Sequence, residues 1–404
     1  METAIYTLTS ELHDETAVNA VTKSFLDSLQ IEYEFKGANY DDYGTHPLNL
    51  IFVRTGGTEG VFLRLLTNNQ LRTDHPFYLL TSGKSNSLAA SMEILSFLRQ
   101  QGMRGEIIHG SPQYISERIK IICRVNKASK SLRGSRLGII GKPSDWLISS
   151  TYDQSALMDK LGIQLVDIPM PRLMQAMEKT PVKEPEETTD MDCVKKSLPV
   201  ANQIYGALKS IVADERLNGL TIRCFDLLTS VHNTGCLALA KLNSEGIVAG
   251  CEGDVPTMIT MTIAQSLTGL SGFQANPSSI NPETGEIIFA HCTIPLNMVD
   301  SYEFDTHFES GIGVGIRGKM PEGAVTIFKV SGDMKRFFLA EGTLLRNQSE
   351  SDLCRTQIVV KLTWREDIHY FLNEPIGNHH VIIPGHHGMM IIDFMHIIDN
   401  QLEI

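Results

Sequence analysis

The feature that most constrains the fold is a regular alternation of strand-like and helix-like segments through the first third of the chain. Short apolar stretches such as AIYTLTS and LNLIFVR alternate with longer helix-like stretches such as SLAASMEILSFLRQQG. Parallel strands cannot be joined by a tight turn, so this alternation predicts a parallel sheet with crossover helices. We therefore expect a Rossmann-like α/β domain over residues 1–133.

The rest of the chain divides into a second alternating block and a strand-rich block. The second block begins at SRLGIIGKPSDW and is interrupted by a polar, proline-rich loop or insertion at 178–192. Beyond residue 268, EIIFAHCTI, AVTIFKV and CRTQIVVKL are strand-like, with few helices between them. The predicted fold class is α/β, with two Rossmann-like parallel-sheet domains (1–133 and 134–267) followed by a β-rich C-terminal domain (268–404).

Composition excludes several classes of partner. The 404-residue chain has a formal net charge of −12, so it lacks the basic excess that neutralises nucleic-acid phosphates. No apolar run reaches the length of about 18 residues that a membrane span needs, and the first residues do not look like a signal peptide. The seven cysteines are scattered without a CxxC pair, as in reduced cytosolic proteins. We expect a cytoplasmic protein with neither nucleic acid nor membrane as a partner.

One carboxylate, that of Glu252, directly follows a predicted strand. In GIVAGCEGDVPTMIT, Glu252 follows an apolar stretch, Asp254 suits a helix cap and Pro256 suits the first turn of that helix. Open α/β sheets bind ligands at the carboxyl ends of their strands. These residues alone leave two interpretations open, a solvated turn and a ligand site that contains Glu252.

A glycine motif further along resembles a dinucleotide fingerprint only in its letters. Residues 313–318 spell GxGxxG. A true fingerprint follows a strand and opens a helix, whereas the strand-like AVTIFKV comes after this one. We interpret it as a glycine-rich loop between strands, which removes the main support for a nicotinamide oxidoreductase.

Histidines gather near the C-terminus, four of them in GNHHVIIPGHHG. On a strand, His379 and His380 would point to opposite faces, so at most one of them enters a given site. His291 stands alone in IIFAHCTIP, where a histidine is more often a satisfied core residue than a ligand. With Glu252, His291 and one histidine of the pair would form an oxygen–nitrogen ligand set that suits Mn²⁺, Mg²⁺ or Co²⁺.

Four segments resemble the L-fucose isomerase/L-arabinose isomerase superfamily in its short, fucose isomerase-like form. They are LGIIGKPSDWLISS, NTGCLALAKLNSEGIVAGCEGD, FAHCTIP and GNHHVIIPGHHGMMIIDFM, and the similarity covers about residues 130–404. It implies two Rossmann-like domains, a β-rich C-terminal domain, and an Mn²⁺-dependent aldose–ketose isomerase that works through an enediol. It also implies a sugar substrate and a homo-oligomer, either a trimer or a hexamer.

The resemblance assigns metal and catalytic residues. Glu252 is the implied metal ligand and general base, His379 is a second ligand, and His291 matches a further histidine of the arabinose isomerase branch. The family's second acid falls on Asn276, which can offer an amide oxygen to the metal but cannot carry a proton. We expect Asn276 to share the metal and catalytic site with Glu252. The alternative is a sugar-binding or regulatory relative with reduced or lost isomerase activity.

Four more residues are expected around the substrate. Trp146 can present an aromatic face to sugar C–H groups, with core packing as the alternative. Asn378 and His380 flank His379 in the sequence. Asp254 is expected to cap its helix and to orient the site.

Overall fold

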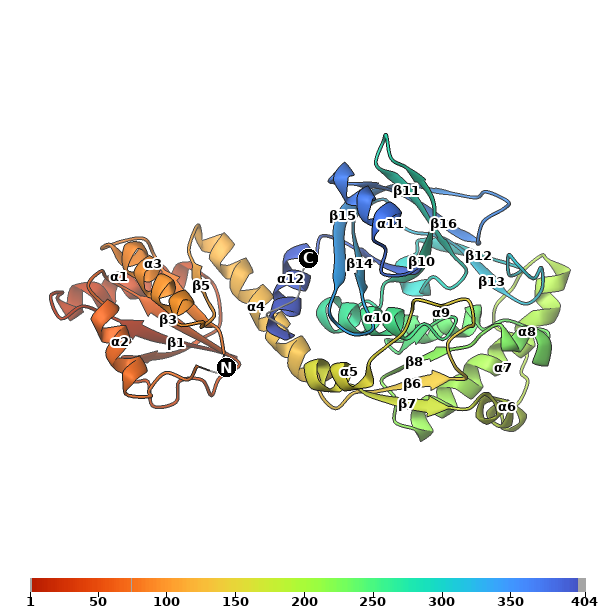
Figure 1. The fold of residues 1–404 in the computed structure, drawn as a ribbon, viewed down its shortest axis with the longest axis horizontal. Helices are drawn as coiled ribbons and strands as arrows, with labels where there is room; N and C mark the ends of the chain where they lie inside the picture. The colour runs from red at the N-terminus through yellow and green to blue at the C-terminus, as the bar shows by residue number, and fades with distance from the viewer. Residues whose placement is uncertain (1, 74, 399–404) are drawn as a thin grey trace. The chain divides into compact units, whose positions relative to one another are not determined.

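The computed structural model describes residues 2–73 and 75–398, and the chain forms two compact units, Met1–Lys127 and Ala128–Ile404. The first unit is built on a parallel sheet with the strand order β2-β1-β3-β4-β5 (Figure 1). Its strands are β1 (Thr3–Leu8), β2 (Glu34–Gly37), β3 (Leu48–Val53), β4 (Phe77–Thr81) and β5 (Gly105–Ile108). Its helices are α1 (Glu15–Ser28), α2 (Glu59–Thr67), α3 (Ser87–Gln100) and α4 (Pro112–Leu132), the last of which continues past Lys127.

Helices cover both faces of this first sheet. Ala4 and Tyr6 of β1 pack in one core with residues of α2 and α3, whereas Ile5 packs in a second core with residues of α1 and α4. Successive side chains of a strand point to opposite faces, so a strand with helices on both sides is apolar throughout. All six residues of β1 are accordingly buried.

The second unit begins with another parallel sheet, in the order β7-β6-β8-β9. Its strands are β6 (Arg136–Ile140), β7 (Gln164–Ile168), β8 (Gly219–Ile222) and β9 (Val248–Gly250). The helices of this part are α5 (Gln154–Leu161), α6 (Met170–Lys179), α7 (Asp192–Asp214), α8 (Asp226–Ser230), α9 (Cys236–Ser244) and α10 (Val255–Thr268). The strand order reverses between β6 and β8, and the loops after such strands are where open α/β sheets bind ligands.

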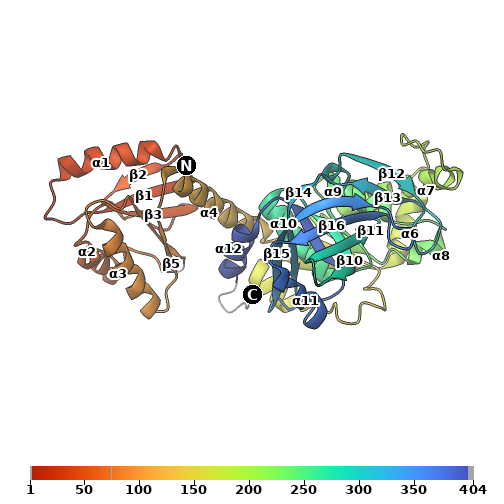
Figure 2. The same ribbon diagram turned by 90° about the horizontal axis from the view of Figure 1, so that it is seen from above.

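The strand-rich part of the second unit is a closed antiparallel barrel, several strands of which lie side by side in Figure 2. Around the barrel the order is β10 (Phe273–Asn281), β11 (Glu286–His291), β16 (Thr356–Leu362), β15 (Phe337–Gln348), β14 (Gly323–Val330) and β17 (His380–Pro384). The remaining elements are β12 (Ser301–Asp305), β13 (Gly315–Lys319), η1 (Leu296–Met298), η2 (Arg365–Asp367), α11 (Ile368–Asn373) and α12 (Gly388–Ile398). The GxGxxG motif enters strand β13, which pairs with β12, and opens no helix.

Helix α10 connects the second sheet to the barrel. It packs against β8 and β9 of the sheet and against β14 and β17 of the barrel. A helix enclosed in this way is buried on nearly all sides, as its sequence VPTMITMTIAQSLT allows. Its first residues therefore lie where the sheet's carboxyl edge meets the barrel.

The predicted α/β class, with two parallel sheets and a β-rich C-terminal part, is confirmed in outline, and the β-rich part is a closed barrel. The domain boundaries near residues 133 and 267 stay predictions. Within residues 2–73 and 75–398, no helix combines the length and apolarity that crossing a membrane requires.

Candidate active site

Glu252 occupies a tight turn just after β9. Its backbone φ is +62° and that of Gly253 is +70°, both in the left-handed region. A Cβ atom at Gly253 would come within 2.6 Å of the Lys142 carbonyl oxygen, so this position favours glycine. The Ser144 amide donates to the Glu252 carbonyl at 2.9 Å. This turn fixes the start of the Glu252 side chain, of which 12% is exposed.

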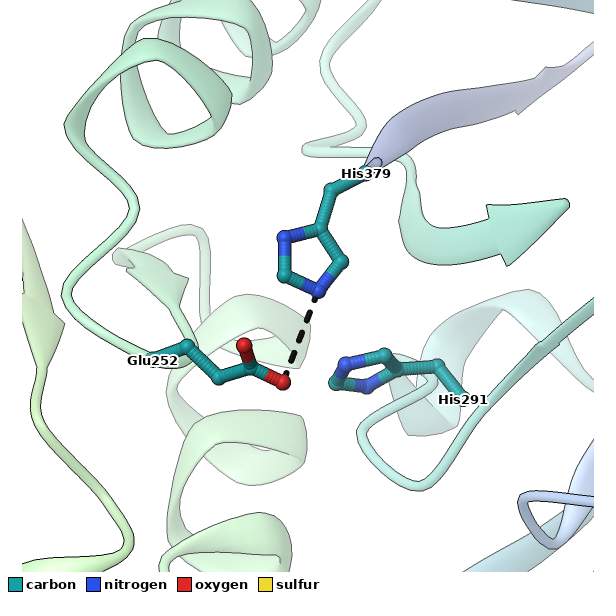
Figure 3. Close-up of side chains that lie close together, drawn as sticks. All are labelled: Glu252, His291 and His379. Atoms are coloured by element: carbon teal, nitrogen blue, oxygen red, sulfur yellow. Dashed lines mark ion pairs between the residues drawn. The ribbon is translucent and has the colours of Figure 1, made fainter. Parts of the chain in front are cut away.

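His379 is held against the cap of α10. Asp254 caps this helix by accepting the Thr257 amide through Oδ1 at 2.9 Å, and its Oδ2 lies 2.9 Å from His379 Nδ1. In a neutral ring this contact places the proton on Nδ1 and the lone pair on Nε2. Among the described residues, Nε2 of His379 has no hydrogen-bond partner, and it lies 3.6 Å from Glu252 Oε1 (Figure 3).

His291 approaches the same point from the end of β11 (Figure 3). Its Nδ1 lies 2.9 Å from Thr293 Oγ1, and its ring centroid lies 5.3 Å from that of His379. One possible ligand atom from each of Glu252, His291 and His379 lies within 4.8 Å of the other two. The turn after β9, the end of β11 and the residue before β17 thus bring together one carboxylate and two imidazoles.

The charges of this cluster are coupled. Burial favours a neutral Glu252, but the close approach and charge of His379 outweigh burial and lower the pKa of Glu252 to about 2. Burial disfavours a charged His379, yet its contacts with Asp254 and Glu252 raise its pKa to about 9. Burial lowers the pKa of His291 to about 3, so that ring is neutral at pH 7. A metal ion that binds here would displace the proton from His379 Nε2.

The cluster fits a divalent metal ion. One carboxylate and two imidazoles are ligands that Mn²⁺ and other divalent first-row metals accept. The buried Nε2 of His379 accepts or donates no hydrogen bond within the described part of the chain, and a cation would satisfy this atom. The Nδ1 atoms of both histidines already contact oxygen atoms of Asp254 and Thr293, as is typical of histidine ligands.

Asn276 lies beside the cluster. It belongs to β10, which pairs with β11 on one side and with β17 on the other. Its cross-strand partner is Ala290, the residue before His291. Its side-chain oxygen accepts from Asn378, the residue before His379, at 3.2 Å. The strand register therefore places Asn276 between the two histidines.

Trp146 contacts Glu252 directly. In the loop after β6, its Nε1 donates to Glu252 Oε2 at 2.7 Å, and half of the residue remains exposed. Its ring meets Phe225 edge-on at 4.7 Å, and Phe225 meets His307 edge-on at 5.5 Å. Trp146, Phe225 and His307 form a row of rings that starts at Glu252.

A pocket of about 420 Å³ adjoins Trp146 and the residues next to His379. Its lining residues are Trp146, Leu147, Ser149, Ser150, Pro277, Phe371, Pro375, Gly377, Asn378 and His380. His380 is fully buried and packs against Phe371, with its Nε2 2.9 Å from the Tyr370 hydroxyl. His379 and His380 therefore face different surroundings.

Asp254 caps α10 as the sequence predicts, whereas two residues near the site, His307 and Lys329, were not predicted from the sequence. Asp254 is fully buried and contacts His379, so it has no surface for a substrate. No sequence pattern marked His307 apart from its place before the glycine motif. Its ring nevertheless contacts Phe225, which in turn contacts Trp146 at the site. Lys329 lies in the apolar segment AVTIFKV, and a lysine inside an apolar strand is the one sequence signal that could have drawn attention to it.

No family model matches the chain, but curated proteins do. A sulfoquinovose isomerase of Alkalicoccus urumqiensis is 23% identical over 51% of this chain and 49% of its own length. Those of Priestia aryabhattai and Clostridium sp. (strain MSTE9) are 23% and 25% identical, over 69% and 68% of this chain and 66% of each relative. The matches thus span between half and two thirds of the relatives. Over about half to two thirds of its length, the chain is similar to proteins named as sulfoquinovose isomerases.

Proposed function

We propose that this protein is a divalent-metal-dependent aldose–ketose isomerase that acts on an open-chain five- or six-carbon sugar. The observation that carries the proposal is the convergence of Glu252, His291 and His379, with the Nε2 atom of His379 3.6 Å from the carboxylate and without a hydrogen bond to any described residue. The similarity to sulfoquinovose isomerases supports the reaction class. The resemblance to the fucose and arabinose isomerases suggests Mn²⁺ as the metal and a pentose or deoxyhexose as the substrate.

Glu252, His291 and His379 would hold the metal, with Asn276 as a weaker fourth ligand or a neighbour of the site. A bound divalent ion would polarise the sugar carbonyl at C1 and the hydroxyl group at C2. This would make the C–H bond at C2 more acidic. The pKa of Glu252 is held low, so its carboxylate is ionised at neutral pH and can accept a proton. The Trp146 bond to Oε2 orients that carboxylate.

In the proposed reaction, Glu252 takes the proton from C2 of the aldose and delivers it to C1. The hydroxyl proton on O2 moves to O1, so the product is the 2-ketose with the same atoms. The pocket beside Trp146 can take the rest of the carbon chain, since its volume lies in the range typical of small-molecule sites. Ser149, Ser150 and Asn378 line it with groups that can hydrogen-bond to sugar hydroxyls.

The cellular setting and assembly stay predictions from the sequence. We expect a cytoplasmic protein that forms a homo-oligomer, a trimer or a hexamer. Size-exclusion chromatography with light scattering measures the assembly directly.

A panel of aldoses tests the reaction class. The protein is stripped with a chelator, and ketose formation from sulfoquinovose, L-fucose and L-arabinose is followed with and without added Mn²⁺. We expect turnover of at least one aldose only in the metal-loaded protein. Sugar binding without turnover of any aldose would favour the sugar-binding alternative instead.

Replacing Asn276 probes the missing second acid. Asn276→Asp restores a negative charge between the two histidines, and a negative charge close to a divalent cation strengthens its binding. We expect the Kd for Mn²⁺, measured by isothermal titration calorimetry, to fall by about tenfold or more. A tenfold change in Kd corresponds to about 1.4 kcal/mol of binding free energy. A gain in turnover alongside it would indicate that the native chain is a slow relative. An unchanged Kd would show that Asn276 lies beyond the metal's reach.

A further inference from the structure

A fully buried lysine contacts the residues that support the proposed metal site. Lys329 is the seventh residue of β14, and its side chain is 0% exposed. Lysine is among the residues least often buried completely, because removing its charge from water is unfavourable without a partner. Its position therefore calls for a specific role.

The contacts of Lys329 lead to Asp254. Its Nζ donates to Thr257 Oγ1 at 2.6 Å and lies 3.7 Å from Asp254 Oδ2. Thr257 in turn donates to both carboxylate oxygens, its hydroxyl to Oδ2 at 2.7 Å and its amide to Oδ1 at 2.9 Å. Oδ2 also contacts His379 Nδ1 at 2.9 Å. Lys329 is thus the charged end of a buried series of contacts that runs through Asp254 to His379.

Hydrogen bonds and charge stabilise the Asp254 carboxylate in different ways. Thr257 and the start of α10 satisfy the carboxylate oxygens as hydrogen-bond acceptors, but they bring no whole positive charge. An ionised carboxylate that is 0% exposed is held in place far better with a cation close by. Lys329 supplies that cation from strand β14 of the barrel.

We propose that Lys329 is a positioning residue of the metal site, whose charge holds Asp254 in place so that Asp254 fixes the His379 ring with Nε2 toward Glu252. This inference rests on the proposed function. Lys329 has no exposed surface, so it acts through Asp254 and His379 without touching the sugar. Contacts that support a metal ligand from behind commonly change metal affinity about 10- to 100-fold when they are removed.

A double-mutant cycle on metal affinity tests this role. The Kd for Mn²⁺ is measured by calorimetry for wild type, Lys329→Met, Asp254→Asn and the double variant, with thermal unfolding of each metal-free protein. We expect Lys329→Met to weaken Mn²⁺ binding about 10- to 100-fold in wild type and less than about threefold in the Asp254→Asn background. Ile327→Val, a core change on the same strand, is the control and should lower the unfolding temperature while leaving the Kd within about twofold.

The outcomes distinguish a failure of the Lys329 role from a failure of the proposed metal-dependent function. If wild type binds Mn²⁺ and Lys329→Met binds it equally well, or if the lysine change has the same effect in both backgrounds, the positioning role is overturned. If wild type binds no Mn²⁺, the metal proposal itself fails. If Lys329→Met does not fold, the double variant, which removes both charges together, decides: it should bind Mn²⁺ like Asp254→Asn alone, and weaker binding would overturn the role.

Discussion

Glu252→Gln is expected to lower kcat by about 10²- to 10⁴-fold while the protein stays folded. This range is what a positioned general base typically contributes. Glutamine has nearly the same shape, and its amide oxygen can still accept from Trp146, but it cannot carry a proton between C2 and C1. The substitution also removes the ion pair with His379. The side chain lies in a turn outside the hydrophobic core clusters, so the far-ultraviolet circular dichroism spectrum should not change.

Glu309→Gln is the matched control for this prediction. Glu309 is a largely exposed residue in the loop before β13, and partial burial of its carboxyl group and the charge of Glu252 raise its pKa. Its replacement should leave kcat within a few-fold of wild type. A Glu252→Gln variant that keeps more than about a tenth of the wild-type kcat would remove Glu252 from the role of base.

The two adjacent histidines should separate metal binding from stability. His379→Ala removes a proposed ligand, so we expect the affinity for Mn²⁺ to fall about 100-fold or more. His380→Ala should keep metal affinity within a few-fold, because this ring packs against Phe371 and contacts the Tyr370 hydroxyl. Loss of that buried ring should lower the free energy of unfolding by about 2 kcal/mol or more.

Calorimetry with Mn²⁺ and chemical denaturation of the metal-free proteins measure both effects. Equal loss of Mn²⁺ affinity in the two variants would contradict the assignment of His379 as the ligand. A His379→Ala variant that binds Mn²⁺ normally would remove it from the site altogether.

Local patterns predicted part of the site. An apolar strand that ends in a glycine placed Glu252 at the carboxyl edge of a sheet, and the caps of α10 followed from Asp254 and Pro256. Both inferences rely on interactions within a few residues of the chain, which sequence patterns describe well. The alternation of strands and helices predicted the parallel sheets for the same reason.

The contacts that complete the site join distant parts of the chain and left little trace in the sequence. Closure of the barrel depends on the pairing of β10 with β17, and strand register over such a separation is set by packing. The bond between Trp146 and Glu252 and the contact of Asp254 with His379 each span more than a hundred residues. Lys329 stands in an apolar segment that predicts a strand and says nothing of its partner.

The central claim is that Glu252 moves a proton between two carbons of a metal-bound sugar. It is tested most directly by running the reaction in D₂O with the Mn²⁺-loaded protein and following the sugar by proton NMR. We predict a ketose that carries solvent deuterium at C1 in part of the molecules, because a proton held on Glu252 can exchange with solvent before it is returned. A ketose in which all of the original C2 hydrogen is retained at C1, or no ketose from any aldose of the panel, would contradict the account.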